Sequence, residues 1–522
     1  MEGVFKNSDN GLLEFFKREM GFCSPRIFSR RMSASEVLLL FPSPRCISLF
    51  DLMMVFFSVN SFVPAGFMLT GISYAYVFIR MTLIKQIDLY GKLTGHQGCV
   101  NTVEFNSTGE LLVSGSDDRQ IMLWDWAARK LKFSYPSGHL DNIFQARFMP
   151  FTDDRKIVTS SADCQVRLSQ LLENGSVETK RLSKHQGRVH RLAVEPGSPY
   201  VFYSCGEDGF VQHYDLRSNS ATKLFYCSSI GENNRSSSSI GLNSIVIDPR
   251  NPNYFAVGGA DVYARVYDIR NYDVNASTKA GSPVDTFCAR HLIGTRDAHI
   301  TALAYSRTSE LLISYNDELI YLFQKNMGLG PHPTSSSSED LHKLVDAQVY
   351  SGHRNSQTVK GVNFFGPNDD YILSGSDCGH IFIWKKKDGE LVRLMVGDRH
   401  IVNQMEPHPT IPLLASCGIE KTIKLWAPSS NVVSPLPDNV QEIMEANRQG
   451  REDHSRVTLT PDVIMHVLRL HRRQARVYIE RRYNREDVES DNDGDEGESY
   501  VLGFSDGDPS EEGGNSRECN IS

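Results

Sequence analysis

Short runs of alternating apolar and polar residues recur between residues 87 and 427, and small or turn-forming residues separate them. Alternation with a period of two is typical of β-strands that have one buried face. One unit recurs seven times: small residues, a turn that is usually acidic, and an alternating run that usually ends on an aromatic residue. Its copies are SGSDDRQIMLWD (114–125), SSADCQVRLSQ (160–170), SCGEDGFVQHYD (204–215), VGGADVYARVYD (257–268), SYNDELIYLF (314–323), SGSDCGHIFIW (374–384) and SCGIEKTIKLW (416–426).

The seven copies align on one turn residue and on a second residue six positions later. The turn position holds Asp118, Asp163, Asp208, Asp261, Asp317, Cys378 and Glu420. The second position holds Trp124, Ser169, Tyr214, Tyr267, Phe323, Trp384 and Trp426. A histidine stands about twenty residues before most turns, at His96, His139, His185, His299, His353 and His400. The fourth repeat has no Gly-His, the second has Ser169 in place of an aromatic, and the sixth has Cys378 in place of the acid.

A period of about 40–45 residues with Gly-His at one end and Trp-Asp at the other is the WD-repeat pattern. Each repeat forms four short antiparallel strands and cannot bury both faces alone, whereas seven repeats closed in a ring bury each blade against its neighbours. We therefore predict an all-β fold, a seven-bladed WD-repeat β-propeller over residues 83–428. Residues 87–93 are expected to close the ring as an extra strand of the last blade.

The polar residues of the first repeat have the composition of a Ser-His-Asp triad: His96, Ser114 and Asp118, with Trp124 beside them. The set recurs in part around the ring, whereas a triad is defined by the geometry around a single nucleophile. No GxSxG, GxxxxGK[ST] or HExxH motif accompanies it. We therefore expect no enzyme activity, catalytic residue, metal or cofactor. We expect a buried structural network instead, at His96, Ser114, Asp118, Trp124, Asp163, Asp208, Asp261, Asp317, Trp384 and Trp426.

Two consecutive repeats end on the same box, Tyr-Asp-x-Arg. Asp215 precedes Arg217 in the third repeat, and Asp268 precedes Arg270 in the fourth. An arginine with a purely structural role would be expected in every blade, so a pair on neighbouring blades favours a docking site. A solvated charge at the edge of the ring is the alternative, because exposed ion pairs contribute little.

These boxes, with segments such as NIFQARFMP (142–150) and FAVGGADVYARVYDIR (255–270), resemble the WD-repeat substrate receptors of cullin-4 RING ubiquitin ligases. The resemblance covers about residues 83–428 and also 11–36. It implies a non-catalytic receptor that docks on a DDB-type adaptor through Arg217, Arg270, Asp215 and Asp268. It also implies presentation of a protein substrate for ubiquitination, in the nucleus and cytoplasm. The rival hypothesis is a general WD-repeat scaffold for chromatin or RNA protein complexes; we expect no direct nucleic-acid partner.

Residues 37–82 interrupt this pattern with an apolar insert. Of these 46 residues, 25 are Phe, Leu, Ile, Met or Val, whose codons share U at the second position. Deleting the insert joins the flanking segments into the sequence that the resemblance implies, which favours a translated intron. A transmembrane segment is the alternative, because Leu52 to Ile79 carries no charge and is long enough to span a bilayer.

The flanks of the repeats predict short helical elements and a disordered tail. Residues 11–36 open with a candidate helix, and the resemblance implies that residues 1–36 are a helical extension that docks on the adaptor; a frayed terminus is the alternative. Residues 429–485 are expected to form a linker with one helix near 437–447 and a basic amphipathic helix at about 461–483. Residues 486–522 form an acidic tail, in which 486–512 hold twelve Asp or Glu and no Lys or Arg. This composition predicts disorder, and it makes the net charge of −8 uninformative about the folded part.

Overall fold

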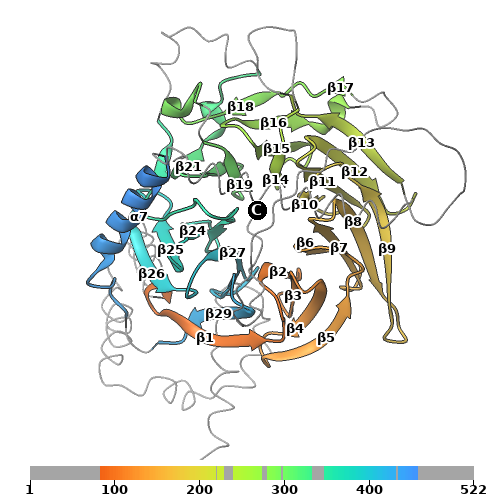
Figure 1. The fold of residues 1–522 in the computed structure, drawn as a ribbon, viewed down its shortest axis with the longest axis horizontal. Coiled ribbons are helices and arrows are strands. Elements are labelled where there is room, and N and C mark those ends of the chain that lie inside the picture. Colours follow the sequence, from red (N-terminus) through yellow and green to blue (C-terminus); the bar gives the residue numbers. More distant parts are fainter. Residues whose placement is uncertain are drawn as a thin grey trace, which may run out of the picture. The chain divides into compact units, whose positions relative to one another are not determined.

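Seven sheets stand as blades around a central axis in the computed structural model, which describes residues 83–218, 220–228, 239–272, 279–295, 298–331, 346–430 and 433–455 (Figure 1). The predicted seven-bladed propeller is thereby confirmed. The predicted docking extension, apolar insert, basic helix at 461–483 and acidic tail lie outside the described residues. In the described part of the chain, no helix has the length and apolar character that a membrane crossing needs.

The first three blades are consecutive along the chain, and each runs from an inner to an outer strand. Blade one consists of β2 (Val100–Phe105), β3 (Leu111–Ser116), β4 (Gln120–Asp125) and β5 (Lys130–Pro136). Blade two consists of β6 (Ile143–Phe148), β7 (Lys156–Ser161), β8 (Gln165–Leu171) and β9 (Val177–Lys184). Blade three consists of β10 (Val189–Val194), β11 (Val201–Gly206), β12 (Phe210–Asp215) and β13 (Ser220–Tyr226), with the short β17 (Lys279–Ala280) added in parallel.

The remaining blades follow the same order. Blade four consists of β14 (Leu242–Ile247), β15 (Tyr254–Gly259), β16 (Ala264–Asp268) and β18 (Asp285–Phe287). Blade five consists of β19 (Ile300–Tyr305), β20 (Leu311–Tyr315), β21 (Ile320–Phe323) and β22 (Gln348–Tyr350). Blade six consists of β23 (Val362–Phe365), β24 (Tyr371–Gly375), β25 (His380–Lys385) and β26 (Leu391–Val396). Short 3-10 turns η1 (Ile269–Asn271), η2 (Arg290–Leu292) and η3 (Lys325–Met327) lie in blades four and five.

Blade seven combines strands from the two ends of the repeat region, and this closes the ring. It consists of β27 (Val402–Pro407), β28 (Leu414–Gly418), β29 (Thr422–Pro428) and β1 (Ile87–Thr94). β1 pairs antiparallel with β29 from Ile87 opposite Pro428 to Thr94 opposite Thr422. The predicted closing strand is therefore present, and it makes one sheet depend on residues more than three hundred positions apart.

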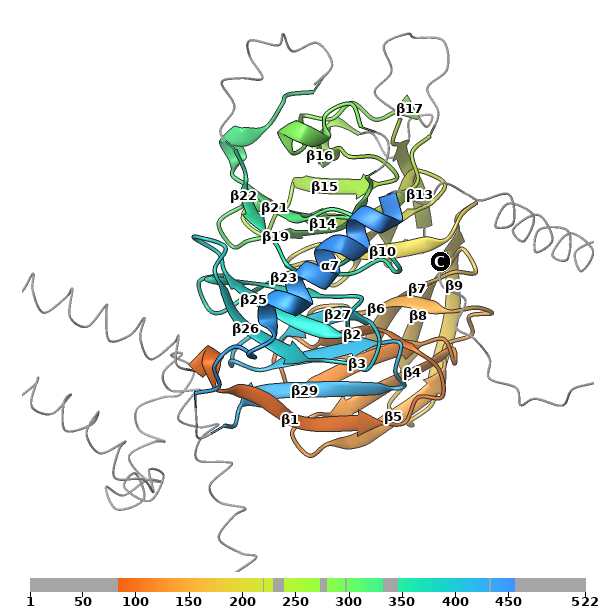
Figure 2. The ribbon, with the colours of Figure 1, turned by 60° about the vertical axis from the view of Figure 1, so that its left-hand side comes forward.

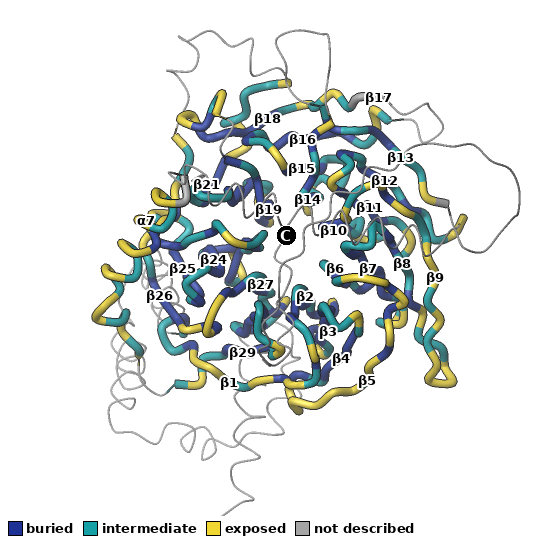
Figure 3. Tube along the Cα trace, in the orientation of Figure 1, coloured by how far each residue is buried: buried dark blue, intermediate teal, exposed yellow. Residues whose placement is uncertain are grey.

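Burial follows the position of a strand within its blade (Figure 3). The middle strands are packed on both faces: β3 and β24, for example, have nearly every residue buried, whereas β5 is largely exposed. The core consists of clusters that cross from blade to blade; one joins Leu112 and Trp124 of blade one to Ala415 and Leu425 of blade seven. Burial of each such large apolar side chain stabilises the fold by about 1.5–3 kcal/mol, so blade-to-blade packing holds the ring together.

One helix covers the outside of the ring. α7 (Val440–Ser455) packs against the shared core of blades five and six through Val440, Ile443 and Met444 (Figure 2). These positions are three and four residues apart, so they lie on one face of the helix. The helix expected near 437–447 thus exists, but it begins after Pro437 and continues to Ser455.

The antiparallel order gives the ring two distinct edges. The first and third strands of each blade end at one edge, which contains Asp215 and Asp268; we call it the box rim. The turns between second and third strands and the connections between blades lie at the opposite edge, which contains His96 and Asp118; we call it the network rim. The rim on which a turn residue lies is therefore determined by the strands that it joins.

Candidate protein-docking rim

The box of blade three holds its arginine in a fixed geometry. The Nε of Arg217 donates to Oδ1 of Asp215 at 3.0 Å, and its Nη2 donates to Oδ2 at 2.8 Å. The backbone N–H of Arg217 donates to the same carboxylate at 2.9 Å, so Asp215 also fixes the turn. The guanidinium carbon lies 5.5 Å from the ring centroid of Tyr200, which precedes β11. The arginine is thus oriented, while 63% of its side chain stays exposed.

The box of blade four repeats this geometry. The Nε of Arg270 donates to Oδ1 of Asp268 at 2.9 Å, and its Nη2 donates to Oδ2 at 2.6 Å. Asp268 also accepts the backbone N–H of Arg270 at 3.0 Å and caps η1. The guanidinium carbon lies 5.8 Å from the ring centroid of Tyr254, and 59% of the side chain is exposed. Two neighbouring blades therefore present equivalent, pre-oriented guanidinium groups at one rim.

The electrostatics of the boxes follow from these forks. Hydrogen bonds from the Arg217 side chain are the main cause that lowers the pKa of Asp215, to about 2. The Arg270 side chain lowers the pKa of Asp268 in the same way. Both carboxylates are consequently ionised at neutral pH. Each box is an ordered ion pair with nearly neutral net charge. Its guanidinium group can donate hydrogen bonds to a partner in a defined direction.

The other blades place different groups at the box rim. In blade one the indole of Trp126 donates to the carbonyl of Gly109 at 2.6 Å, and the ring of His408 contacts that carbonyl at 2.8 Å. Trp126 is buried there, and the exposed Arg129 of the same turn lies over Tyr90 of β1, with its guanidinium carbon 4.3 Å from the ring centroid, instead of forming a box with an aspartate two residues before it. Gly109 is required, because its φ is +77° and a Cβ would lie 2.2 Å from His408. In blade six, Lys385 is paired with Glu390.

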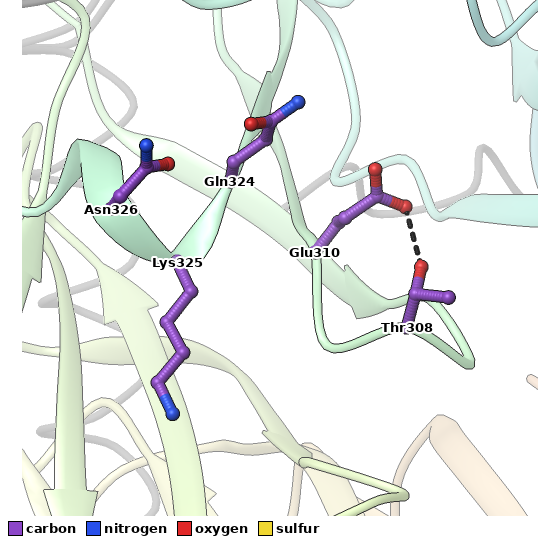
Figure 4. A pocket seen from close by; sticks show the side chains of 5 residues that line it. All are labelled: Thr308, Glu310, Gln324, Lys325 and Asn326. Atoms are coloured by element: carbon purple, nitrogen blue, oxygen red, sulfur yellow. Dashed lines mark hydrogen bonds between the residues drawn. The ribbon is translucent and has the colours of Figure 1, made fainter.

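Blade five contributes a pocket of about 360 Å³ on the box rim, lined by Thr308, Glu310, Gln324, Lys325 and Asn326 (Figure 4). Gln324 and Asn326 occupy the positions that Asp215 and Arg217 occupy in blade three. The carboxylate of Glu310 accepts from Thr308 at 2.8 Å and from Lys386 of blade six at 2.9 Å. The lining is therefore polar, and it belongs to the box rim without an arginine fork.

The predicted polar network is present in blade one at the opposite rim. The Nδ1 of His96 contacts Asp118 at 2.8 Å, and its Nε2 contacts Ser114 at 2.7 Å. The indole N–H of Trp124 donates to the same Ser114 oxygen at 2.8 Å. Ser114 is fully buried, so its hydroxyl has no surface that a substrate could reach. The geometry serves to satisfy buried polar groups, which would cost about 1–3 kcal/mol each if unpaired.

Blades two and three carry the same network with substitutions. His139 contacts Asp163 at 3.1 Å and Thr159 at 2.8 Å, and His185 contacts Asp208 at 2.9 Å and Ser204 at 2.7 Å. Burial raises the pKa of Asp163, but hydrogen bonds from His139 and two backbone N–H groups outweigh this and lower it to about 2. In blade two, where the aromatic is absent, Ser169 and Tyr135 of blade one are buried, and neither hydroxyl has a hydrogen-bond partner among the described residues.

Blade four replaces the missing histidine with an arginine that sequence reasoning missed. Arg265, itself buried, donates to both oxygens of Asp261, at 2.9 and 2.5 Å. In blade five the described contacts of Asp317 differ from the prediction: its backbone N–H donates to the Asn355 carbonyl at 2.8 Å, and its carboxylate accepts from Asn316 at 2.6 Å. Burial lowers the pKa of His299, and this effect outweighs the nearby Asp317 carboxylate, which acts in the opposite direction.

Blade six lacks the network, and α7 lies over the gap. His353 is fully buried and neither ring nitrogen has a hydrogen-bond partner among the described residues. Burial, Arg451 and Lys360 lower its pKa to about 3, so the ring is neutral. Asn447 of α7 donates to the Gly352 carbonyl at 2.8 Å and to the Cys378 sulfur at 3.3 Å. The indole of Trp384 donates to the Ser351 carbonyl at 3.0 Å.

Blade seven corrects one prediction. His400 is exposed and does not occupy the network position. Asp398, which follows Gly397 as His96 follows Gly95, takes that place and is buried. Lys424 donates to Glu420 at 2.7 Å and lies 3.8 Å from Asp398, so it stands between the two carboxylates. Burial and the hydrogen bond with Glu420 raise the pKa of Asp398 to about 6. The indole of Trp426 donates to Ser416 at 2.8 Å, as Trp124 does to Ser114.

The fold and its repeated network define a class, the WD-repeat β-propellers. The family model "WD domain, G-beta repeat" matches residues 88–125, 176–215 and 345–385. The chain belongs to the family of WD-repeat proteins that includes human WD and tetratricopeptide repeats protein 1. It is 35% identical to that protein over 70% of this chain and 89% of the relative.

Two further relatives match a smaller share. Protein ALTERED SEED GERMINATION 2 of Arabidopsis thaliana is 35% identical over 48% of this chain and 37% of its own length. Mouse DDB1- and CUL4-associated factor 6 is 35% identical over 47% of this chain and 28% of its own length. The chain thus spans about a third of the length of these two relatives.

Proposed function

We propose that the protein is a non-catalytic substrate receptor of a cullin-4 RING ubiquitin ligase. In this proposal the box rim docks on a DDB-type adaptor, and another surface of the propeller presents a protein substrate for ubiquitination. The ubiquitin chemistry belongs to the RING partner. We further propose that the protein is a receptor of the type of DDB- and cullin-4-associated factor 8, because the segments 142–150 and 255–270 resemble that protein. We also propose that it acts in the nucleus and cytoplasm.

The observation that carries the proposal is the duplicated box. Two arginines on adjacent blades are each held by their own aspartate and each remain more than half exposed. A guanidinium fork that is already oriented loses less side-chain entropy when it binds a carboxylate or a carbonyl group. The name of the mouse relative, DDB1- and CUL4-associated factor 6, supports the choice of the adaptor as the partner.

The test is the affinity of the full chain for the purified DDB-type adaptor. Arg217→Ala combined with Arg270→Ala is expected to weaken binding by about tenfold or more, because truncated interface arginines are frequent hot spots. The combination Arg217→Lys and Arg270→Lys should also weaken it, since lysine keeps the charge but loses the fork. Far-UV circular dichroism and melting should match those of the wild type.

The matched control uses exposed arginines of the network rim. Arg188→Ala combined with Arg399→Ala removes two exposed guanidinium groups from the opposite edge of the ring. It should leave adaptor affinity within about twofold of wild type, since these groups lie outside the proposed interface. Equal affinities of the box variant, the control and the wild type would refute docking through the boxes. Absence of adaptor binding by the wild-type chain would favour the general scaffold instead.

A further inference from the structure

The turn between β6 and β7 carries the most exposed large apolar side chain of the described residues. Phe151 is 78% exposed, although burial of a phenylalanine is normally favourable by about 1.5–3 kcal/mol. Among the exposed large apolar residues that the structure describes, the only other aromatic one is Tyr200, at 39%. Phe151 follows a first strand and Tyr200 precedes a second strand, so both lie on the box rim.

The backbone of this turn is held in an unfavourable conformation. Phe151, Asp153 and Asp154 have φ angles of +54°, +50° and +57°, in the left-handed region that a phenylalanine rarely adopts. Hydrogen bonds maintain it: the Met149 N–H donates to the Lys156 carbonyl at 2.9 Å, and Asn106 of blade one donates to Asp154 at 2.7 Å. A strained and exposed aromatic that its surroundings hold in place indicates a selected function.

The surface is continuous from this turn to the first box. Lys156 ends the turn, and its ammonium nitrogen lies 5.8 Å from the ring centroid of Tyr200. The guanidinium carbon of Arg217 lies 5.5 Å from the same centroid. Tyr200 therefore connects Lys156, at the end of the Phe151 turn of blade two, to the box of blade three. The box of Arg270 lies on the same rim in the next blade. Clusters of exposed aromatic and arginine side chains are typical of interface hot spots.

We propose that Phe151 is a further anchor by which the box rim binds the adaptor. It inserts into an apolar pocket of the adaptor, beside carboxylate or carbonyl groups that receive Arg217 and Arg270. The occupant is a protein surface, because each arginine stands next to its own aspartate, and these carboxylates would repel a phosphate backbone. This inference rests on the proposed function, and it adds a contact that the boxes alone do not supply.

The experiment measures the affinity of the full chain for the purified adaptor with Phe151→Asn. Asparagine tolerates the left-handed backbone, so folding should be preserved, while the apolar anchor is lost. Affinity should fall about tenfold or more, and Phe151→Leu should retain most of it. The matched control is Leu140→Asn, which removes an apolar side chain that is 74% exposed on the network rim, and its affinity should stay within about twofold of wild type.

Each result decides between the two proposals. If Phe151→Asn binds as the wild type does while the double box variant is weakened, the anchor is refuted and the receptor function stands. If neither variant is weakened, docking does not use the box rim and both statements about this surface fail. A wild-type chain that binds no adaptor overturns the receptor function and the anchor together. Equal losses of adaptor affinity in Phe151→Asn and Leu140→Asn would show that the effect is not specific to Phe151, and this would also refute the anchor.

Discussion

Ser114 and Ser374 occupy the same position in blades one and six, and their contacts differ. Both are fully buried. The Ser114 oxygen contacts His96 at 2.7 Å and accepts the Trp124 indole N–H at 2.8 Å. The Ser374 hydroxyl donates only to the neighbouring Gly375 carbonyl, at 3.0 Å, among the described residues. Replacement of each serine by alanine therefore removes the same atom from two different networks.

Ser114→Ala should be the more destabilising change. It leaves the Trp124 N–H and the His96 Nε2 buried without a partner, and each unsatisfied group costs about 1–3 kcal/mol. The free energy of unfolding should thus fall by about 2–6 kcal/mol. Ser374→Ala loses one hydrogen bond to a backbone carbonyl and should cost about 0.5–1.5 kcal/mol. The change in volume is the same for both, so a cavity contributes equally and cancels in the comparison.

The assay is urea unfolding of the full chain, followed by far-UV circular dichroism, with the melting temperature as a second measure. The difference between the two variants is the informative quantity, because it does not depend on a complete two-state description of a large ring. Equal destabilisation by Ser114→Ala and Ser374→Ala would refute the role of the network. Ester hydrolysis by the wild type that Ser114→Ala abolishes would show that blade one is catalytic after all.

Three further changes test other features of the chain. Asp398 has a raised pKa of about 6 when folded, so its contribution to stability is full below about pH 4 and is lost as the pH rises through 6. Asp398→Asn should flatten this decline in unfolding curves recorded between about pH 4 and 7, and an unchanged profile would contradict the assignment. Asn447→Leu removes the hydrogen bonds of α7 to Gly352 and Cys378. It should make the helix susceptible to limited proteolysis while the circular dichroism of the ring is unchanged, and a protease pattern like that of the wild type would argue against a role of Asn447 in holding α7. Deletion of residues 37–82 should leave a folded chain that keeps adaptor binding if the insert is a translated intron, whereas resistance of the intact chain to carbonate extraction from membranes would show a true span.

The ring and most of its repeated parts could be predicted from the amino-acid sequence. Strand period, turn residues and a seven-fold spacing are local properties, so they predict the blades, the closing strand at 87–93 and the network of His96, Ser114, Asp118 and Trp124. The boxes were equally visible, because each Asp-x-Arg pair is two residues apart and its ion pair forms within one turn.

The contacts between groups on different strands and blades could not be predicted in this way and became visible in the folded chain. β26 ends at Val396, opposite His380, and this register brings Asp398 rather than His400 into the network of blade seven. Arg265 replaces a histidine because its side chain returns to the turn at Asp261, and α7 covers the incomplete network of blade six. Lys156 and Arg217 meet over the ring of Tyr200 through the packing of blade two on blade three. These contacts depend on hydrogen-bond register and on ring closure, which residue spacing along the chain does not encode.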